Sequence, residues 1–267
     1  MSIRYHRNEP LRYNEALLEK DRYTFSVLQR ILKLNCQLTI TDDESFIICL
    51  SAKGYPVWVW TADDIAEEKM EEVLKITLKE FPPEEFHYNI KYEAAEYFMS
   101  HAEDVRLLMN MMTYECLETT APTPHAAGQA VPCEEKDLDL LVDWLLAFQE
   151  EIGIDKRPAE EHREGLKEKI GLKALYFWVD AAGKPVCLCG FRPTPDGLSS
   201  LGPVFTPPEE RRKHYAENLV YAVTEEVLGR GLTPILYTNA DYEASNACYK
   251  KVGFKLKGTL CTIGRSL

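Results

Sequence analysis

The pattern of hydrophobic and polar residues predicts alternating helices and strands along the whole chain. Apolar residues at spacings of three and four predict helices, and short β-branched or aromatic runs predict strands. In the first half we expect helices over residues 14–34, 63–80 and 92–101, and strands over residues 45–51, 56–60, 87–91 and 105–115. In the second half we expect helices over residues 134–151, 158–170 and 243–252 and a long helix ending at Leu228, with strands over 174–180, 185–191, 198–205 and 234–238 and from Phe254 onward. Both halves are therefore expected to be mixed α and β.

The two halves meet at the segment ETTAPTPHAAGQAVPC, residues 118–133, which is rich in Ala, Pro, Thr and Gly and has no periodic apolar pattern. Such a composition is typical of a linker. We therefore expect a first domain over residues 1–119, a linker over 120–133 and a second domain over 134–267.

The two halves also resemble one another locally. The stretches VWVWTADDIAEEKMEEVLKITL (residues 57–78) and GPVFTPPEERRKHYAENLVYAV (residues 202–223) each contain an apolar strand, a threonine, acidic residues and an amphipathic helix. This similarity favours an internal repeat. The first copy has Asp63, Asp64, Glu67 and Glu68 before its helix, where the second has a basic run. We therefore expect only the second copy to receive an anion.

Composition and charge narrow the class of protein. The chain has 267 residues, of which 45% are hydrophobic and 28% charged, as in ordinary globular proteins. Its net charge of −12 repels phosphate backbones, which argues against nucleic acid as the main partner. The N-terminal residues contain no apolar leader segment, and no run of 18 apolar residues occurs. We therefore expect a cytoplasmic protein that binds no membrane.

The cysteines point to neither disulfides nor a metal site. Eight cysteines lie mostly in apolar contexts such as FIICL and PVCLCGF, without CxxC pairs or histidines at metal spacing. Cys187 and Cys189 lie two apart on a predicted strand and so share one face. We expect buried free thiols and no bound metal.

The basic run Arg211–His214 allows two interpretations of the helix that follows strand 198–205. In the first, Thr206 is the N-cap, Pro207 the first helical residue and Glu209 completes a capping box, so the basic residues form a solvated surface. In the second, residues 206–210 form a turn and the helix begins near His214. Its free N–H groups then face an anion, because a helix N-terminus carries partial positive charge.

Two motifs of the second half together resemble the GNAT superfamily of acyl-CoA-dependent N-acetyltransferases. The pyrophosphate loop of that family reads R/Q-x-x-G-x-G/A, and residues 211–216 read RRKHYA after the lead-in VFTPPEE. The second motif is NADYEASNACYKKVGF, residues 239–254, which is similar to the family's N-x-x-(A/S)-N-x-x-Y-x-x-x-G-F ending. The resemblance covers residues 134–267. It implies two GNAT-like mixed-sheet α/β domains in tandem, of which the N-terminal one is degenerate.

The resemblance also implies functional residues. The pantetheine arm of the cofactor is expected to bind along Val204, Phe205 and Thr206, with Gly202 and Pro203 compatible with a bulge that opens this strand edge. The pyrophosphate is expected on the loop that contains Arg211, Arg212, Lys213, His214, Tyr215 and Ala216. His214 replaces the inner glycine of the motif, and an imidazole at negative φ with its ring turned outward would keep its N–H available.

Asn246 and Tyr249 lie three apart on the last predicted helix and so share a face. By resemblance, Asn246 contacts the cofactor arm and Tyr249 is the general acid that protonates the departing thiolate. The structural alternative is that Tyr249 only packs beside Phe254. The sequence singles out no general base for the amine, since Glu150, Glu151, Tyr237 and Asn239 are all candidates.

The expected function is transfer of an acetyl group from acetyl-CoA to a primary amine of a small molecule or peptide by direct attack. The alternatives are a non-catalytic acyl-CoA sensor or interaction protein with a decayed site, and a phosphate-binding protein without a link to CoA. The expected partners are the amine acceptor and a second copy of the chain in a homodimer, with no nucleic acid.

Overall fold

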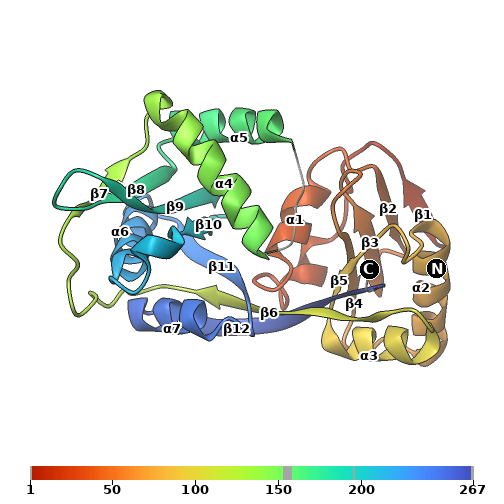
Figure 1. The fold of residues 1–267 in the computed structure, drawn as a ribbon. Helices are drawn as coiled ribbons and strands as arrows, with labels where there is room; N and C mark the ends of the chain where they lie inside the picture. Colours follow the sequence, from red (N-terminus) through yellow and green to blue (C-terminus); the bar gives the residue numbers. More distant parts are fainter. Residues whose placement is uncertain (1, 153–157, 195, 266–267) are drawn as a thin grey trace. The chain divides into compact units, whose positions relative to one another are not determined.

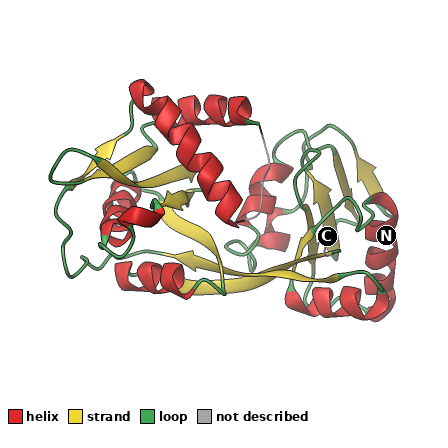
Figure 2. Cartoon of the chain, in the orientation of Figure 1, coloured by secondary structure: helices red, strands yellow, loops and turns green. Residues whose placement is uncertain are grey.

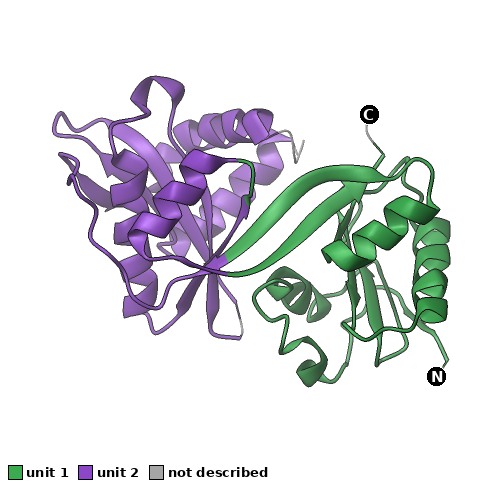
Figure 3. Cartoon of the chain, turned by 90° about the horizontal axis from the view of Figure 1, so that it is seen from below, with its two compact units in different colours: residues 1–113, 239–241, 257–267 green, residues 114–238, 242–256 purple. Residues whose placement is uncertain are grey.

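The chain forms two compact units that are not continuous segments. The computed structural model describes residues 2–152, 158–194 and 196–265. Unit 1 comprises Met1–Thr113, Asn239–Asp241 and Lys257–Leu267, and unit 2 comprises Tyr114–Thr238 and Tyr242–Leu256. Figure 3 colours the two units. The predicted limits of the domains, residues 119 and 134, stay a prediction.

Unit 1 is built on central strands that are buried on both faces. Its strands are β1 (Arg4–His6), β2 (Leu38–Thr41), β3 (Phe46–Leu50), β4 (Val57–Thr61) and β5 (Tyr88–Ile90), and its helical segments are η1 (Glu15–Leu18), α1 (Ser26–Leu32), α2 (Glu67–Glu80) and α3 (Tyr92–His101). Val73 of α2 and Phe98 of α3 pack with Ile48 and Val59 in one core. On the other face, Phe25 packs edge-on against Trp58. Burial on both faces explains why β3 and β4 read as nearly continuous apolar runs.

Unit 2 repeats this construction. Its strands are β7 (Gln129–Pro132), β8 (Leu175–Val179), β9 (Pro185–Pro193), β10 (Leu198–Phe205) and β11 (Thr233–Asn239), and its helical segments are η2 (Glu135–Asp137), α4 (Leu138–Ile152), α5 (Ala159–Gly171), η3 (Pro208–Glu210), α6 (Tyr215–Gly229) and α7 (Glu243–Val252). Leu141 of α4 and Leu166 of α5 pack on Phe177 and Phe205. Helix α6 contacts β8, β9 and β10. Helices therefore cover the strands of unit 2 (Figure 2).

The strand order confirms the tandem arrangement that the sequence predicts. Together with β6 (Arg106–Glu115) and β12 (Lys255–Gly264), the described strands follow the order β1-β2-β3-β4-β5-β12-β6-β11-β10-β9-β8-β7. In each half, the fourth and fifth strands of that half pair in parallel, β4 with β5 and β10 with β11. In each half a helix follows each of these two strands (Figure 1). The last strand of each half is exchanged, because β12 pairs with β5 and β6 lies beside β11.

The structure differs from the expected elements at several short segments. The predicted helix over residues 14–34 is η1 and α1 separated by turns. The predicted linker contains β7, which pairs with β8 at the end of the strand order. Strand β2 is joined to β3 by a turn in which the Asp42 carboxylate accepts hydrogen bonds from the N–H groups of Glu44, Ser45 and Phe46. Such a side chain-capped turn ends a strand without glycine or proline, which is why the apolar pattern alone misses β2.

Candidate functional site

The candidate site begins where β10 and β11 separate. These parallel strands pair only over Leu198–Ser200 and Thr233–Ile235. Strand β10 continues to Phe205 along β9, with a register shift between Leu201 and Val204. This irregularity is the predicted bulge, and Gly202 adopts φ 143° there. Beyond Ser200, β10 therefore has β9 on one side and no β11 partner on the other, which leaves backbone groups for an extended ligand.

The three predicted pantetheine residues differ in their surroundings. Val204 pairs with Cys189 and is half-buried, whereas Phe205 is buried in the core with α4. The Thr206 hydroxyl donates to Cys187 Sγ at 3.1 Å, and its carbonyl accepts from Arg211 Nε at 2.9 Å. Thr206 is therefore already engaged within the protein, and the unpaired edge of β10 consists of the residues before it.

The helix after β10 begins late. Residues Pro208–Glu210 form the short turn η3, whose N-cap is Pro207 with no side-chain cap, and α6 starts at Tyr215. The predicted capping box at Thr206 is wrong, because its hydroxyl turns toward Cys187 instead of the helix N-terminus. The alternative boundary near His214 is confirmed. The basic residues consequently lie in the loop before the helix and in its N-cap.

The loop has the backbone of a glycine motif without the glycines. Arg212 adopts φ 61° and His214 adopts φ 63°, both in the left-handed region. The expected negative φ at His214 is wrong. A left-handed residue at this point turns successive N–H groups toward one side, which makes an anion-binding concavity. A side chain there costs about 1 kcal/mol relative to glycine, so the geometry is held by the surrounding structure.

Within the described residues, Arg211 donates its N–H to the Pro208 carbonyl, but the N–H groups that follow it in this loop have no acceptor. Among the described residues, the first N–H of α6 that donates to backbone is that of Asn218, which bonds the His214 carbonyl at 3.2 Å. Within that same part of the chain, the N–H groups of residues 212–217 donate no backbone hydrogen bond, and His214 provides no side-chain cap. Unbonded N–H groups at a helix N-terminus fit a phosphate or pyrophosphate.

Most of the cations around the loop have acidic partners. Arg211 Nη2 lies 2.6 Å from Glu151 Oε2 at the end of α4. Lys213 Nζ lies 2.8 Å from Glu210 Oε2, and His214 Nδ1 lies 3.4 Å from Glu217 Oε2. Hydrogen bonds from Lys184 and then Lys213 lower the pKa of Glu210. The positive charge that the sequence displays is thus largely compensated.

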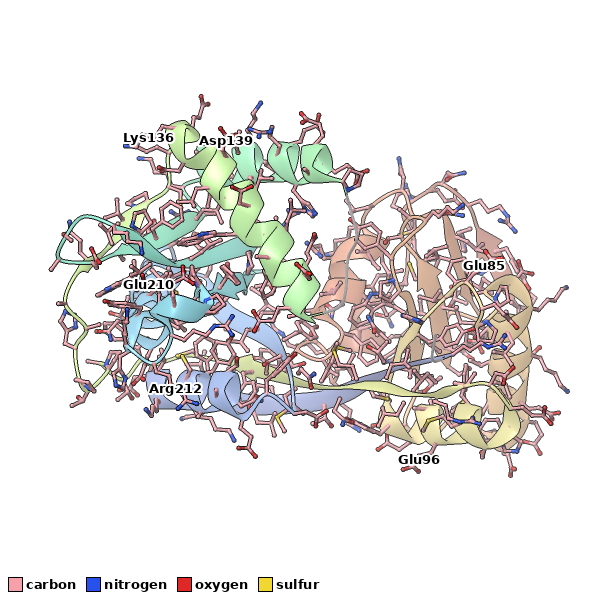
Figure 4. The ribbon with its side chains drawn as sticks, viewed as in Figure 1. Glu85, Glu96, Lys136, Asp139, Glu210 and Arg212 are labelled. Carbon is pink, nitrogen blue, oxygen red and sulfur yellow. The ribbon has the colours of Figure 1, made fainter. Side chains whose placement is uncertain are left out.

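Arg212 is the exception among the four basic residues. Its side chain is exposed, and it has no hydrogen bond or ion pair within the described part of the chain. Figure 4 labels Arg212 and Glu210 on the segment between β10 and α6. An anion at this loop would therefore meet backbone N–H groups and one uncompensated guanidinium.

Helix α7 contributes Asn246 and Tyr249, which lie on its buried face as their spacing predicts. The Tyr249 ring is 9% exposed and meets Phe254 edge-on at 6.1 Å, so the predicted packing contact exists. Its hydroxyl makes no hydrogen bond with the described residues. Burial raises the pKa of Tyr249 far above its ordinary value, which keeps the phenol protonated at neutral pH. The Nδ2 of Asn246 donates to the Tyr242 carbonyl at 2.9 Å.

The thiols near this helix are poor nucleophiles. Cys187 and Cys189 of β9 are fully buried, and Cys248 beside Tyr249 is half-buried. Burial raises the pKa of Cys187 and of Cys248 to about 12. All eight cysteines are free, as expected. Among the described residues, no cluster of three or more His, Cys, Asp or Glu could hold a metal.

The candidates for the general base have different surroundings. Glu150 is exposed, Glu151 pairs with Arg211, and Tyr237 lies on β11. Asn239 belongs to unit 1, where its Oδ1 accepts from the Asp241 N–H. Lys169 also belongs to this region, although its sequence context does not single it out, since its Nζ donates to the Gly202 carbonyl at the bulge at 2.9 Å. These two residues are 33 positions apart, and no local sequence pattern links them.

At the matching position in unit 1, after β4 and β5, the charged side chains pair with one another. The parallel pairing of β4 and β5 ends at Val59 and Ile90, like that of β10 and β11. There, Lys91 Nζ lies 2.6 Å from Asp21 Oδ2 and 2.7 Å from Asp63 Oδ1. The Trp60 indole N–H also donates to Asp21 at 2.7 Å. Ion pairs within the protein therefore occupy this position, and the expectation that only the second copy receives an anion stays a prediction.

Comparisons with known proteins identify the fold. The family model described as FR47-like protein matches residues 181–262. An acetyltransferase of the GNAT family from Colwellia psychrerythraea is similar over 100% of both chains, with 12% identity and a TM-score of 0.62. A GCN5-related N-acetyltransferase from Sphaerobacter thermophilus has 16% identity and a TM-score of 0.65, covering 85% of this chain and 79% of that one.

A third similar structure, a GCN5-related N-acetyltransferase from Kribbella flavida, has 13% identity and a TM-score of 0.62 over 93% of this chain and 96% of that one. The chain therefore has the GNAT acetyltransferase fold, as the motifs predict. No curated protein matches the sequence. None of the described helices has the length and hydropathy to span a membrane.

Proposed function

We propose that the protein is an N-acetyltransferase that transfers the acetyl group of acetyl-CoA to a primary amine of a small molecule or peptide. The observation that carries this proposal is the combination, in unit 2, of an unpaired β10 edge, a loop of unbonded N–H groups and a buried phenol on α7. Acyl transfer from a thioester needs a site for an extended arm, a site for phosphates and a proton donor. Each of these features supplies one.

Different parts of the site have different roles in cofactor binding and acyl transfer. The N–H groups of residues 212–216 and the Arg212 guanidinium hold the pyrophosphate, while β10 before Thr206 receives the pantetheine arm as an added strand. Acetyl-CoA supplies the activated acyl group. The amine nitrogen attacks the carbonyl carbon, the C–S bond breaks, and Tyr249 gives its proton to the departing sulfur. The attacking nitrogen loses one proton to water, because no side chain is assigned as base, and Tyr249 regains a proton from water, so the products are the amide and CoA thiol.

Binding tests the first part of this proposal. Acetyl-CoA titrated into the full chain by calorimetry is expected to bind, and to raise the unfolding temperature in proportion to its occupancy. Arg212→Ala should weaken this binding several-fold, because it removes the uncompensated cation. The matched control is Lys213→Ala, whose ammonium is already paired with Glu210. Absence of acetyl-CoA binding to the unaltered chain would refute the proposal.

Turnover tests the second part. Thiol release from acetyl-CoA should increase when a suitable amine is added, and a panel of spermidine, glucosamine, lysine methyl ester and a short peptide with a free N-terminus covers the main chemical types. The chain's net charge of −12 favours the cationic members of the panel through electrostatic steering.

The second candidate function is a non-catalytic acyl-CoA sensor. It is favoured by the absence of glycine from residues 211–216 and by the acidic partners of Arg211, Lys213 and His214. A sensor would bind acetyl-CoA without releasing thiol with any amine of the panel. Tyr249→Phe would then change nothing measurable, whereas in an enzyme it reduces turnover.

A further inference from the structure

The bulge in β10 leaves one carbonyl whose direction is not fixed by the strands. The β10–β9 register shifts between Leu201 and Val204, and the pairing of β10 with β11 has already ended at Ser200. Gly202 lies inside this interval with φ 143°. Glycine has access to several backbone conformations at such a point. Some other contact must therefore select the one that is present.

Lys169 supplies this contact. It lies in the last turns of α5, and its Nζ donates to the Gly202 carbonyl oxygen at 2.9 Å. An ammonium–carbonyl hydrogen bond is charge-assisted and is stronger than one between neutral groups. Because the Gly202 carbonyl and the Pro203 nitrogen belong to one planar peptide, fixing the carbonyl also fixes the path of the chain into Val204.

A glycine on β9 also leaves space next to this carbonyl. A Cβ added to Gly190 of β9 would lie 3.2 Å from the Gly202 oxygen and 2.7 Å from Leu175 Cδ2. Glycine at this position therefore leaves room for the Gly202 carbonyl to turn away from the unpaired edge of β10. Lys169 holds the carbonyl from α5, and Gly190 leaves the space for it.

The ammonium also lies within electrostatic reach of the strand next to the bulge. Burial raises the pKa of Cys189, and the charge of Lys169 acts on this thiol in the opposite direction. Cys189 pairs with Val204 and also contributes to the raised pKa of Tyr249, after burial and Cys248. Lys169 therefore lies near the strand pair β9 and β10 at the bulge.

We infer that Lys169 is a positioning residue for acyl transfer, which holds the Gly202–Pro203 peptide so that the next N–H of the bulge, that of Val204, donates to the acyl carbonyl oxygen, since Pro203 has no N–H. This inference rests on the proposed acetyltransferase function. It adds that binding of the acyl group of the cofactor depends on Lys169 of α5, whereas binding of the phosphates does not. A purely structural lysine would instead stabilise the packing of α5 on β10 and affect every ligand equally.

Two ligands separate these roles without any amine acceptor. Calorimetry with acetyl-CoA and with CoA measures the contribution of the acyl group, since the two share every other contact. Lys169→Met should weaken acetyl-CoA binding about five- to tenfold, the value of one lost hydrogen bond. It should change CoA binding less than about twofold. Lys169→Arg should restore most of the acetyl-CoA affinity, and Lys167→Met, an exposed lysine on the same helix, should change neither.

The outcomes are distinct. Equal weakening of both ligands by Lys169→Met, or no weakening of acetyl-CoA, would overturn the inference while leaving the proposed function intact. Failure of the Arg variant to exceed the Met variant would also overturn it. If the unaltered chain binds neither ligand, the proposed function fails and the inference fails with it. A second variant, Gly190→Ala, should reproduce the selective loss of acetyl-CoA affinity, because it presses on the same carbonyl.

Discussion

At the scale of single residues, the candidate site depends on side chains whose surroundings the sequence does not reveal. His214 occupies a glycine position of the motif, yet it adopts the left-handed backbone of that glycine at φ 63°. The motif pattern predicted the place of the loop but not this conformation, since residue type alone favours negative φ for histidine. The loop geometry is therefore set by its flanks, η3 and α6.

The conformation of His214 predicts an unusual order of stabilities. His214→Gly should be about 1 kcal/mol more stable than His214→Ala, because alanine keeps a Cβ at positive φ and glycine does not. In most loop positions the order is reversed, since glycine increases the entropy of the unfolded chain. Urea unfolding of the two variants gives the difference directly. An alanine variant as stable as the glycine variant would contradict the left-handed backbone.

Tyr249 carries the strongest residue-level prediction about activity. Its hydroxyl is protonated near neutral pH, as in an ordinary tyrosine, and burial raises its pKa further, so the group is present as the phenol and does not act as a base. Tyr249→Phe should reduce kcat about 100-fold or more, the range of a lost general acid. Acetyl-CoA affinity by calorimetry should change less than about twofold. Loss of binding together with activity would mean that Tyr249 is only a packing residue beside Phe254.

At the scale of elements, the apolar pattern predicts the long helices and central strands and misses the short peripheral ones. Helix α2 and strands β3 and β4 follow from strong periodicity or β-branched and aromatic runs. Strands β1 and β7 are three and four residues long at the two ends of the strand order, too short to produce a pattern. The helix predicted over 14–34 is interrupted where Asp21 bonds Trp60 and Lys91, a tertiary interaction that overrides local propensity.

The candidate site was also predictable only in part. Two motifs gave the loop before α6 and the tyrosine of α7, because both lie in continuous sequence. The Lys169–Gly202 hydrogen bond, the Arg211–Glu151 pair and the end of the β10–β11 pairing join residues that are distant in sequence. Only the folded chain reveals them.

The ion pairs that follow β4 and β5 predict a pH dependence for unit 1. Hydrogen bonds from Lys20 and then Lys91 lower the pKa of Asp63 to about 2, whereas the pKa of a free aspartate is about 4. A lowered pKa in the folded state stabilises the protein above the unfolded value, and this contribution is lost as pH falls from about 4 through about 2. Asp63 is half exposed, so solvent screening reduces the effect.

The measurement is the urea midpoint between about pH 6 and about pH 2.5, a range that spans most of this titration. Asp63→Asn should be less stable than the unaltered chain at the upper end and should lose less stability on acidification. Asp64→Asn, an exposed neighbour, is the control and should keep the steep pH dependence. If the urea midpoints of the Asp63→Asn variant and of the unaltered chain change equally with pH over this range, the Asp63 ion pairs do not contribute to the pH dependence of stability.

At the scale of the whole molecule, the exchanged strands make unit 1 depend on residues that are far away in sequence. Strand β12 pairs with β5 through Cys261–Ile90 and Ile263–Tyr88, and the side chains of Cys261 and Ile263 are buried in the unit 1 core. Ile263→Ala should therefore destabilise the protein by about 2–4 kcal/mol. The loss should be seen as reduced hydrogen-exchange protection in β3 and β4. Leu256→Ala, half exposed on the same strand, is the matched control and should have little effect.

The exchange of β6 and β12 also has a consequence for synthesis on the ribosome. Strands β1 to β5 are translated before β6 to β11, but β12, the neighbour of β5, is translated only after them. Until then, β5 has one open edge, and an open edge invites pairing with other nascent chains. Unit 1, whose first strands are made early, thus lacks one of its strands until the second half of the chain has been made. The time during which its open edge can pair with other chains depends on how quickly that half follows.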